Sequence, residues 1–149
     1  MMEQHQRANP GGSTVLSVES FDLSHYLDQQ PGGWEVQANQ LKRTAFSSRI
    51  RILRLPGLFV YQNVWGGTCV VQGQSPEGWL MLGGIVNPDK APVSWCGASA
   101  DRRHFACAAA GQEVDFWVKN DCSSIVVLLA PSLLNQTVGE AACDAITQS

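Results

Sequence analysis

Three histidines and five cysteines are the side chains in this sequence best suited to metal binding or nucleophilic catalysis. A metal centre needs three or four ligands that converge on the ion, and two histidines one residue apart often supply part of such a set. His5, His25 and His104 contain no such pair. The cysteines form no Cys-x-x-Cys pair, and their odd number does not indicate a disulfide framework. The sequence therefore predicts no metal site and no cofactor.

Nucleophilic and acid–base catalysis are also weakly supported. A cysteine nucleophile needs a histidine base within hydrogen-bond reach. Cys107 follows His104 by three residues, which places their side chains on opposite faces of a strand. Glu113 and Asp115 share one strand face, where a carboxylate pair is usually solvated. The glycine-rich phosphate-binding motifs are missing as well. We therefore predict no catalytic residues and a protein that is not an enzyme.

The aromatic residues give a stronger signal, and it indicates a binding pocket. All five tryptophans fall on or beside predicted strands. Alternation along one of these strands places Phe59, Tyr61, Asn63 and Trp65 on the same face. On another strand Trp79 and Met81 share a face with Gly83 and Ile85, and Gly83 leaves room for a close approach to the sheet.

A small barrel either fills its interior with side chains or holds one small ligand. Aromatic walls with a few polar groups suit a ligand, although the same residues could form a closed core, and the sequence leaves both alternatives open. The candidate ligand-binding residues are Arg54, Tyr61, Trp65, Trp79, Met81, Trp95 and Phe116.

Arg54 is the most informative charge among these candidates. It has the parity of Ile50 and Ile52, so strict alternation would direct it inward, where an arginine needs an anionic partner. The alternative, which we favour, is a break in register at Ile52-Leu53 that turns Arg54 outward.

Composition excludes several classes of function. The 149 residues include 10 Lys+Arg and 13 Asp+Glu, a net charge of −3 that argues against nucleic-acid binding by this chain alone. Hydrophobic residues make up 44% and charged residues 15%, which indicates one folded domain and not a disordered chain. No apolar run reaches the roughly 20 residues of a membrane span, and the polar N-terminal residues differ from a secretory signal. We therefore expect a cytoplasmic protein without a membrane partner.

The pattern of apolar runs and turn residues predicts a mainly β fold. Residues 1–18 are expected to form a flexible tail. A short helix is expected over Ser20–Gln30, with Ser20 as its cap and Pro31-Gly32-Gly33 as its stop. Closely spaced turn signals then indicate an antiparallel sandwich or barrel, with a Pro56-Gly57 hairpin and a helical segment after Pro131. The predicted strands are Arg49–Leu55, Leu58–Trp65, Val70–Gln72, Trp79–Val86, Val93–Cys96, Phe105–Ala108, Glu113–Val118 and Ser124–Leu129.

Several short segments also occur in an order that is familiar from one family. They are Phe46-Ser47-Ser48-Arg49, Arg54-Leu55-Pro56-Gly57-Leu58, Pro76-Glu77-Gly78-Trp79 and Ala130-Pro131-Ser132-Leu133-Leu134. In this order, which covers about Phe21 to Leu134, the chain resembles the N-terminal regulatory domain of AraC-type transcriptional regulators, in particular the cupin-like "AraC-binding" subgroup.

The resemblance implies a cupin-like antiparallel β-barrel or sandwich over residues 19–134, with a role in effector sensing and dimerisation. Residues 135–149 would then be a C-terminal helical segment or the start of a linker. In this family two helix-turn-helix units bind DNA, and the residues after Leu134 are too few for either unit. DNA binding is therefore expected only through a domain absent from this chain.

These inferences together favour a non-catalytic domain that binds a small-molecule effector and forms a homodimer. An alternative is a free-standing cupin-like module, plugged by its own aromatic side chains, that binds only protein. A third reading is a metal-independent enzyme in which Arg54, Tyr61 or Glu113 has a perturbed pKa.

Overall fold

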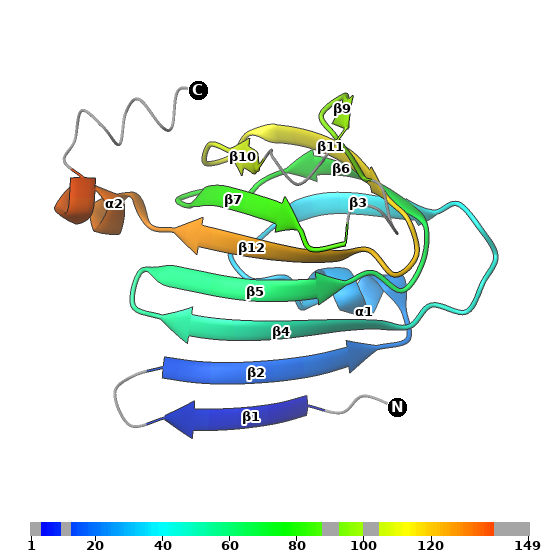
Figure 1. The fold of residues 1–149 in the computed structure, drawn as a ribbon, viewed down its shortest axis with the longest axis horizontal. Helices are drawn as coiled ribbons and strands as arrows, with labels where there is room; N and C mark the ends of the chain where they lie inside the picture. The colour runs from blue at the N-terminus through cyan, green and yellow to red at the C-terminus, as the bar shows by residue number, and fades with distance from the viewer. Residues whose placement is uncertain (1–3, 10–12, 88–92, 100–104, 139–149) are drawn as a thin grey trace.

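The chain folds into two antiparallel β-sheets and two short helices (Figure 1). The structure is a computed structural model that describes residues 4–9, 13–87, 93–99 and 105–138. The larger sheet has the strand order β1 (Gln4–Asn9), β2 (Ser13–Ser20), β4 (Ser48–Leu55), β5 (Leu58–Val64), β12 (Ser123–Leu129), β7 (Leu80–Ile85) and β10 (Ala106–Ala108). The smaller sheet has the order β3 (Glu35–Gln40), β6 (Cys69–Gln74), β11 (Glu113–Val118), β8 (Val93–Trp95) and β9 (Ala98–Ser99). The helices are α1 (Leu23–Asp28) and α2 (Pro131–Val138).

The two sheets form a sandwich and not a closed barrel. Within the described part of the chain, no strand of one sheet pairs with a strand of the other. The predicted fold class, mainly β with short flanking helices, is confirmed in its sandwich form. Figure 1 shows the smaller sheet covering the β5, β12 and β7 side of the larger sheet, whereas β1 and β2 extend beyond it.

Strand alternation builds the core between the sheets. In β4, Ser48, Ile50 and Ile52 are buried while Arg49 and Arg51 are exposed, which is the period of two that a strand imposes. The same alternation continues through the neighbouring strands of the larger sheet. The fully buried side chains with the largest volumes include Tyr26, Tyr61, Ile50, Leu80, Leu128, Val18 and Val71.

Arg54 is exposed, but the register break predicted beside it is wrong. Pairing between β4 and β5 runs without interruption from Arg49–Val64 to Leu55–Leu58. Arg54 therefore keeps the parity of the buried Ile52 and is exposed because it lies at the end of the sheet. Its guanidinium carbon lies 5.6 Å from the centroid of the Phe59 ring, and so an aromatic face takes the place of the anionic partner considered above.

The flexible tail predicted for residues 1–18 is also wrong where the structure describes it. β1 and β2 pair with each other, and β2 continues in register along β4 from Thr14–Arg54 to Ser20–Ser48. Val18 is fully buried. The small and polar residues of this segment give only a weak local strand signal. Its order comes instead from pairing with the partner strand β4.

Helix α1 contacts β2 and β4 of the larger sheet and β3 of the smaller sheet. The helix is shorter than the predicted Ser20–Gln30, and its cap is Asp22, whose carboxylate accepts the His25 backbone N–H at 2.9 Å. Ser20 instead ends β2. The stop at Gly32 and Gly33 is confirmed, since both adopt positive φ angles of 91° and 82°.

Every strand predicted between residues 49 and 129 has a counterpart in the structure. Besides β1 and β2, the sequence analysis missed β3 and β9. β3 alternates exposed polar residues such as Gln37 with half-buried Val36 and Ala38, so its amide-rich composition obscured the pattern. Helix α2 confirms the helical segment after Pro131 as far as Val138, and the rest of the predicted 135–149 segment lies outside the described residues.

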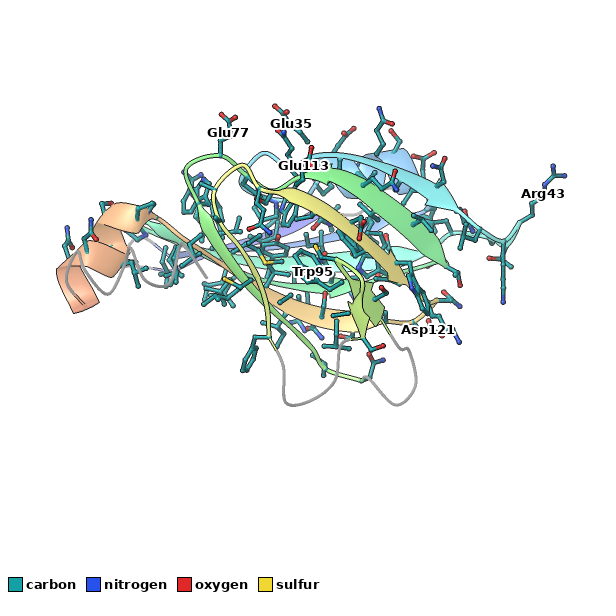
Figure 2. The ribbon with its side chains drawn as sticks, turned by 90° about the horizontal axis from the view of Figure 1, so that it is seen from above. Glu35, Arg43, Glu77, Trp95, Glu113 and Asp121 are labelled. Atoms are coloured by element: carbon teal, nitrogen blue, oxygen red, sulfur yellow. The ribbon has the colours of Figure 1, made fainter. Side chains whose placement is uncertain are left out.

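The outer faces of the two sheets differ in polarity. On the smaller sheet, Gln74 pairs with both Glu35 and Glu113, and Figure 2 shows these two glutamates pointing away from the sandwich. On the larger sheet, one row of direct cross-strand partners is entirely apolar and half-buried. That row consists of Val15, Leu53, Val60, Val127 and Leu82.

Among the described residues, no helix is both long enough and apolar enough to cross a lipid bilayer.

Gly66→Ala is expected to destabilise the fold strongly, because a Cβ at Gly66 would overlap the backbone of Ser47. Overpacking against a backbone typically costs about 1–3 kcal/mol or more. The matched control is Gly84→Ala, whose Cβ would meet only the ring of Phe105 at 3.3 Å. That ring is 78% exposed and can turn away. Urea denaturation measures both variants, and equal stabilities would contradict this account.

Candidate functional site

A cavity lies between the two sheets, among the described residues. Its walls come from β5, β7, β10 and β12 of the larger sheet, from β3, β6, β8 and β11 of the smaller sheet, and from the segment that contains α1. The centres of water molecules could occupy about 80 Å³ of it. One water needs roughly 10–15 Å³ by this measure, so the cavity has room for a small ligand.

Small residues on β7 and β10 create this space. Gly83 pairs directly with Ala106 on one side and with Val126 on the other, and all three line the cavity. Met81 and Ile85 flank Gly83 on the same inner face and also line the cavity. The close approach to the sheet expected at Gly83 is therefore available in the structure.

Aromatic side chains form the opposite wall. Trp95 and Phe116 are stacked, with ring centroids 5.4 Å apart and an interplanar angle of 26°. Trp65 meets Phe116 edge-on at 6.0 Å, and Tyr26 of α1 meets Trp65 edge-on at 4.9 Å. Figure 2 shows Trp95 in the middle of the sandwich. These contacts hold flat ring surfaces against the cavity.

One corner of the cavity is polar. The Gln30 amide Nε2 donates to Asn63 Oδ1 at 3.1 Å, and the Trp34 indole N–H donates to the Tyr61 hydroxyl at 3.0 Å. Ser124 is the direct cross-strand partner of Asn63 and also lines the cavity. The polar corner is defined here as Gln30, Tyr61, Asn63 and Ser124.

The described lining of the site carries no formal charge. None of the described lining residues is Asp, Glu, Lys, Arg or His. Burial raises the pKa of Tyr61 far above its ordinary value, and the hydrogen bond from Trp34 only partly offsets this effect. Burial also raises the pKa of Cys122, another lining residue, to about 12. Both groups are therefore neutral at physiological pH.

The structure brings together five of the seven candidate ligand-binding residues. Tyr61, Trp65, Met81, Trp95 and Phe116 all line the cavity.

Arg54 and Trp79 lie elsewhere. Trp79 precedes β7 and contacts Phe59, with ring centroids 5.0 Å apart, and Arg54 stacks on the same Phe59 ring. The alternation that joined Trp79 to Met81 and Gly83 held only from Leu80 onward, because β7 begins there.

Sequence reasoning missed the contribution of α1 and the turn that follows it. Leu27, Gln30 and Trp34 line the cavity, although they lie far along the chain from the strands that they face. A signal was present at Trp34, since a tryptophan directly after a Pro-Gly-Gly turn needs a surface on which to pack. No local pattern indicated the pairing of Gln30 with Asn63.

The groups considered for catalysis are dispersed. Glu113 and Asp115 are exposed on the outer face of the smaller sheet. Ser20, His25 and Asp22 do not form a catalytic triad. The Ser20 hydroxyl oxygen lies 2.6 Å from His25 Nδ1, but Ser20 is fully buried. The Asp22 carboxylate accepts the backbone N–H of His25 and does not contact its ring. Across the residues that the structure describes, no three His, Cys, Asp or Glu side chains gather as a metal site requires.

No protein-family model matches the sequence, and no curated protein matches it either. Among solved structures, the fold is similar to that in "Crystal structure of the AraC-like transcriptional activator CuxR", with a TM-score of 0.51 and 14% sequence identity. The two chains share a fold. The similarity covers 70% of this chain and 42% of CuxR, so the chain spans less than half of that protein's length. The resemblance to AraC-type regulators is thus supported at the level of the fold.

Tyr26→Phe is expected to leave stability unchanged or to raise it slightly. The Tyr26 hydroxyl is buried without a hydrogen-bond partner among the described residues, and a buried unpaired hydroxyl costs about 1–3 kcal/mol. Tyr61→Phe removes the same atom but leaves the Trp34 indole N–H without its acceptor, so we expect a loss of about 1 kcal/mol. Urea denaturation of both variants tests the contrast, which a larger loss from Tyr26→Phe would contradict.

The free energy of unfolding is expected to fall as the pH rises above about 9. Burial raises the pKa of Cys69 to about 11 and that of Cys122 to about 12, from an ordinary 9.0. The folded state therefore keeps protons that the unfolded state releases, and its stability is highest below pH 9 and declines towards pH 12. Urea denaturation at pH 8 and pH 10.5 under reducing conditions measures the decline. Cys122→Ala should make the decline smaller, and an unchanged pH dependence would count against this assignment.

Proposed function

We propose that this chain is a non-catalytic regulatory domain of the AraC type that binds a small-molecule effector in the cavity between its sheets. The observation that carries the proposal is the cavity itself, which is lined from both sheets and from the α1 segment. The fold similarity to CuxR supports a role in transcription regulation. In this reading the domain acts in the cytoplasm and forms a homodimer, while DNA is contacted by a helix-turn-helix portion and not by these residues.

The position of the cavity suggests how effector binding is transmitted. A ligand shifts a conformational equilibrium only when it binds one state more tightly than another. A ligand in this cavity would touch Leu27, Gln30 and Trp34, which belong to α1 and the turn after it, as well as both sheets. It would therefore stabilise the arrangement in which α1 is docked between β2, β4 and β3.

The alternative function is a protein-interaction module, and one observation favours it. The outer face of the larger sheet carries the apolar row described above, together with Ile125 at 44% exposure. An apolar face of this kind is typical of contact with another protein. The two functions differ in what the cavity does, since the interaction module needs no ligand in it.

Narrowing the cavity separates these functions. A Cβ at Gly83 would meet the Met81 methyl at 3.4 Å and the Ile125 carbonyl at 3.7 Å, so Gly83→Ala fits without a clash. We expect this variant to fold with a Tm close to that of the wild type but to bind the effector at least about tenfold more weakly, because the added methyl occupies cavity volume.

The control is Gly84→Ala. Gly84 also lines the cavity, but its added methyl would point away from it, towards Phe105 on the outer face. Native mass spectrometry of protein purified from cells identifies any retained molecule, and thermal-shift titration measures its affinity for all three proteins. Equal affinity in Gly83→Ala and the wild type would exclude the cavity as the effector site.

A further inference from the structure

We propose that the cavity selects an uncharged ligand built on a single planar ring that carries a hydrogen-bond acceptor such as a carbonyl oxygen. This inference rests on the proposed effector-binding function and specifies the chemical class of the effector. Three independent features of the cavity support it, namely the absence of charge, the orientation of its amides, and the shape and size of its aromatic wall.

The absence of charge excludes ionic ligands. A charged group loses its hydration when it is buried, and it must then find a partner of opposite charge or a dense set of hydrogen bonds. No described side chain that lines the cavity is charged at neutral pH. Arg54 would be a partner for an anion, but it is exposed and stacks on Phe59, outside the cavity lining. Neither an anion nor a cation would find a partner of opposite charge among the described lining residues.

The orientation of the Asn63 amide is fixed by its neighbours. Gln30 Nε2 donates to the backbone carbonyl of Tyr26 at 3.4 Å, and a carbonyl oxygen can only accept. The nitrogen of Gln30 must therefore face this region, and its second hydrogen is donated to Asn63 Oδ1. The Asn63 oxygen is thereby engaged, and among the described residues Asn63 Nδ2 has no acceptor, so its hydrogens are available to a ligand.

The hydrogen-bonding role of the Tyr61 hydroxyl is also fixed by its neighbour. The Trp34 indole N–H is a donor only, so the Tyr61 oxygen accepts from it and the Tyr61 hydroxyl proton is left to donate. Tyr61 and Asn63 are two residues apart on the inner face of β5, and Ser124 lies directly across from Asn63. The polar corner thus presents donors side by side, which matches an acceptor on the ligand and not a second donor.

The aromatic wall favours a flat ring, and the volume limits its size. The stacked pair of Trp95 and Phe116 offers a planar surface, against which an aromatic ring packs offset or edge-on. One water needs roughly 10–15 Å³ of such cavity space and takes about 30 Å³ in the liquid. A space of about 80 Å³ therefore corresponds to roughly 5–8 waters, which is room for one substituted ring and no more.

Three nearly isosteric compounds test the charge and acceptor requirements. Benzamide is neutral and has a carbonyl acceptor, benzoate is its anionic counterpart, and benzamidinium is its cationic counterpart. We expect benzamide to bind at least tenfold more tightly than either ion. Cyclohexanecarboxamide keeps the amide but lacks the planar ring, and it should bind more weakly than benzamide.

The tryptophans provide an internal control for the place of binding. Trp34, Trp65 and Trp95 line the cavity, whereas Trp79 and Trp117 do not. In ¹⁵N-labelled protein, titration with benzamide should shift the indole N–H signals of the first three and leave those of Trp79 and Trp117 in place. Shifts confined to Trp79 or Trp117 would place binding outside the cavity and overturn the proposal.

Asn63→Asp tests the donor directly. An aspartate keeps an oxygen that can accept from Gln30 but replaces the donor Nδ2 with a second oxygen. We expect this variant to lose affinity for benzamide and to prefer benzamidinium, while Ser17→Ala, outside the cavity lining, should leave the preference unchanged. Thermal denaturation establishes that both variants fold. A preference for benzamide that survives Asn63→Asp would remove Asn63 from the recognition.

Two negative outcomes are distinguishable. If benzoate or benzamidinium binds the wild type as tightly as benzamide and shifts the cavity tryptophans, the ligand class is wrong but effector binding stands. If neither these compounds nor toluene, which needs only apolar space, shifts those signals, the cavity takes no small ligand and the proposed function fails with the inference.

Discussion

The cavity depends on a decrease in side-chain volume along one cross-strand row of the larger sheet. From β4 to β10 the row consists of Ile52, Tyr61, Val126, Gly83 and Ala106, each residue directly opposite the next. The large members of the row pack against α1 and the smaller sheet. At Gly83 and Ala106 little side chain remains, so the space above them stays open while the sheets are held apart by the aromatic residues around it. Protein interiors are otherwise close-packed, and this gap is the basis of the proposed effector site.

The polar groups of the cavity lie on a neighbouring cross-strand row of the same sheet. That row consists of Ile50, Asn63, Ser124 and Ile85. Its two polar residues would be costly to bury if they were left without hydrogen-bond partners. The Gln30 amide, placed by the end of α1, satisfies the oxygen of Asn63. The Tyr26 hydroxyl, one helical turn earlier, has no such partner among the described residues. The α1 segment thus gives the buried Asn63 oxygen a hydrogen-bond donor, but it also buries the Tyr26 hydroxyl. The position of α1 therefore affects the polar groups of the cavity.

The sequence allowed good prediction of features set by local pattern and poor prediction of those set by pairing. Alternation placed Tyr61 of β5 on the same face as Trp65, which directly follows β5, and Met81 and Gly83 on one face of β7, all of them cavity residues in the structure. The strand β2 was missed because its order comes from β4 and not from its own composition. Gln30 was missed for a related reason, since its hydrogen bond joins residues 33 positions apart. Arg54 shows the limit of parity, because a residue can keep the inward parity of its strand and still be exposed at the end of the sheet.

The placement of α1 gives the domain a structural element that a ligand can influence. Most lining residues belong to strands whose register is fixed by neighbours on both sides, and these strands have little freedom to move relative to one another. Helix α1 is held instead by side-chain contacts. Tyr26 is fully buried, Leu23 and Leu27 pack against the core, and polar contacts join His25 to Ser20 and Gln30 to Asn63. Elements with few anchoring contacts open at lower free-energy cost than the core of a sheet. A ligand that binds beside Gln30 and Leu27 would therefore have its largest effect on α1, and a chain segment attached to β2 or β3 would experience that change directly.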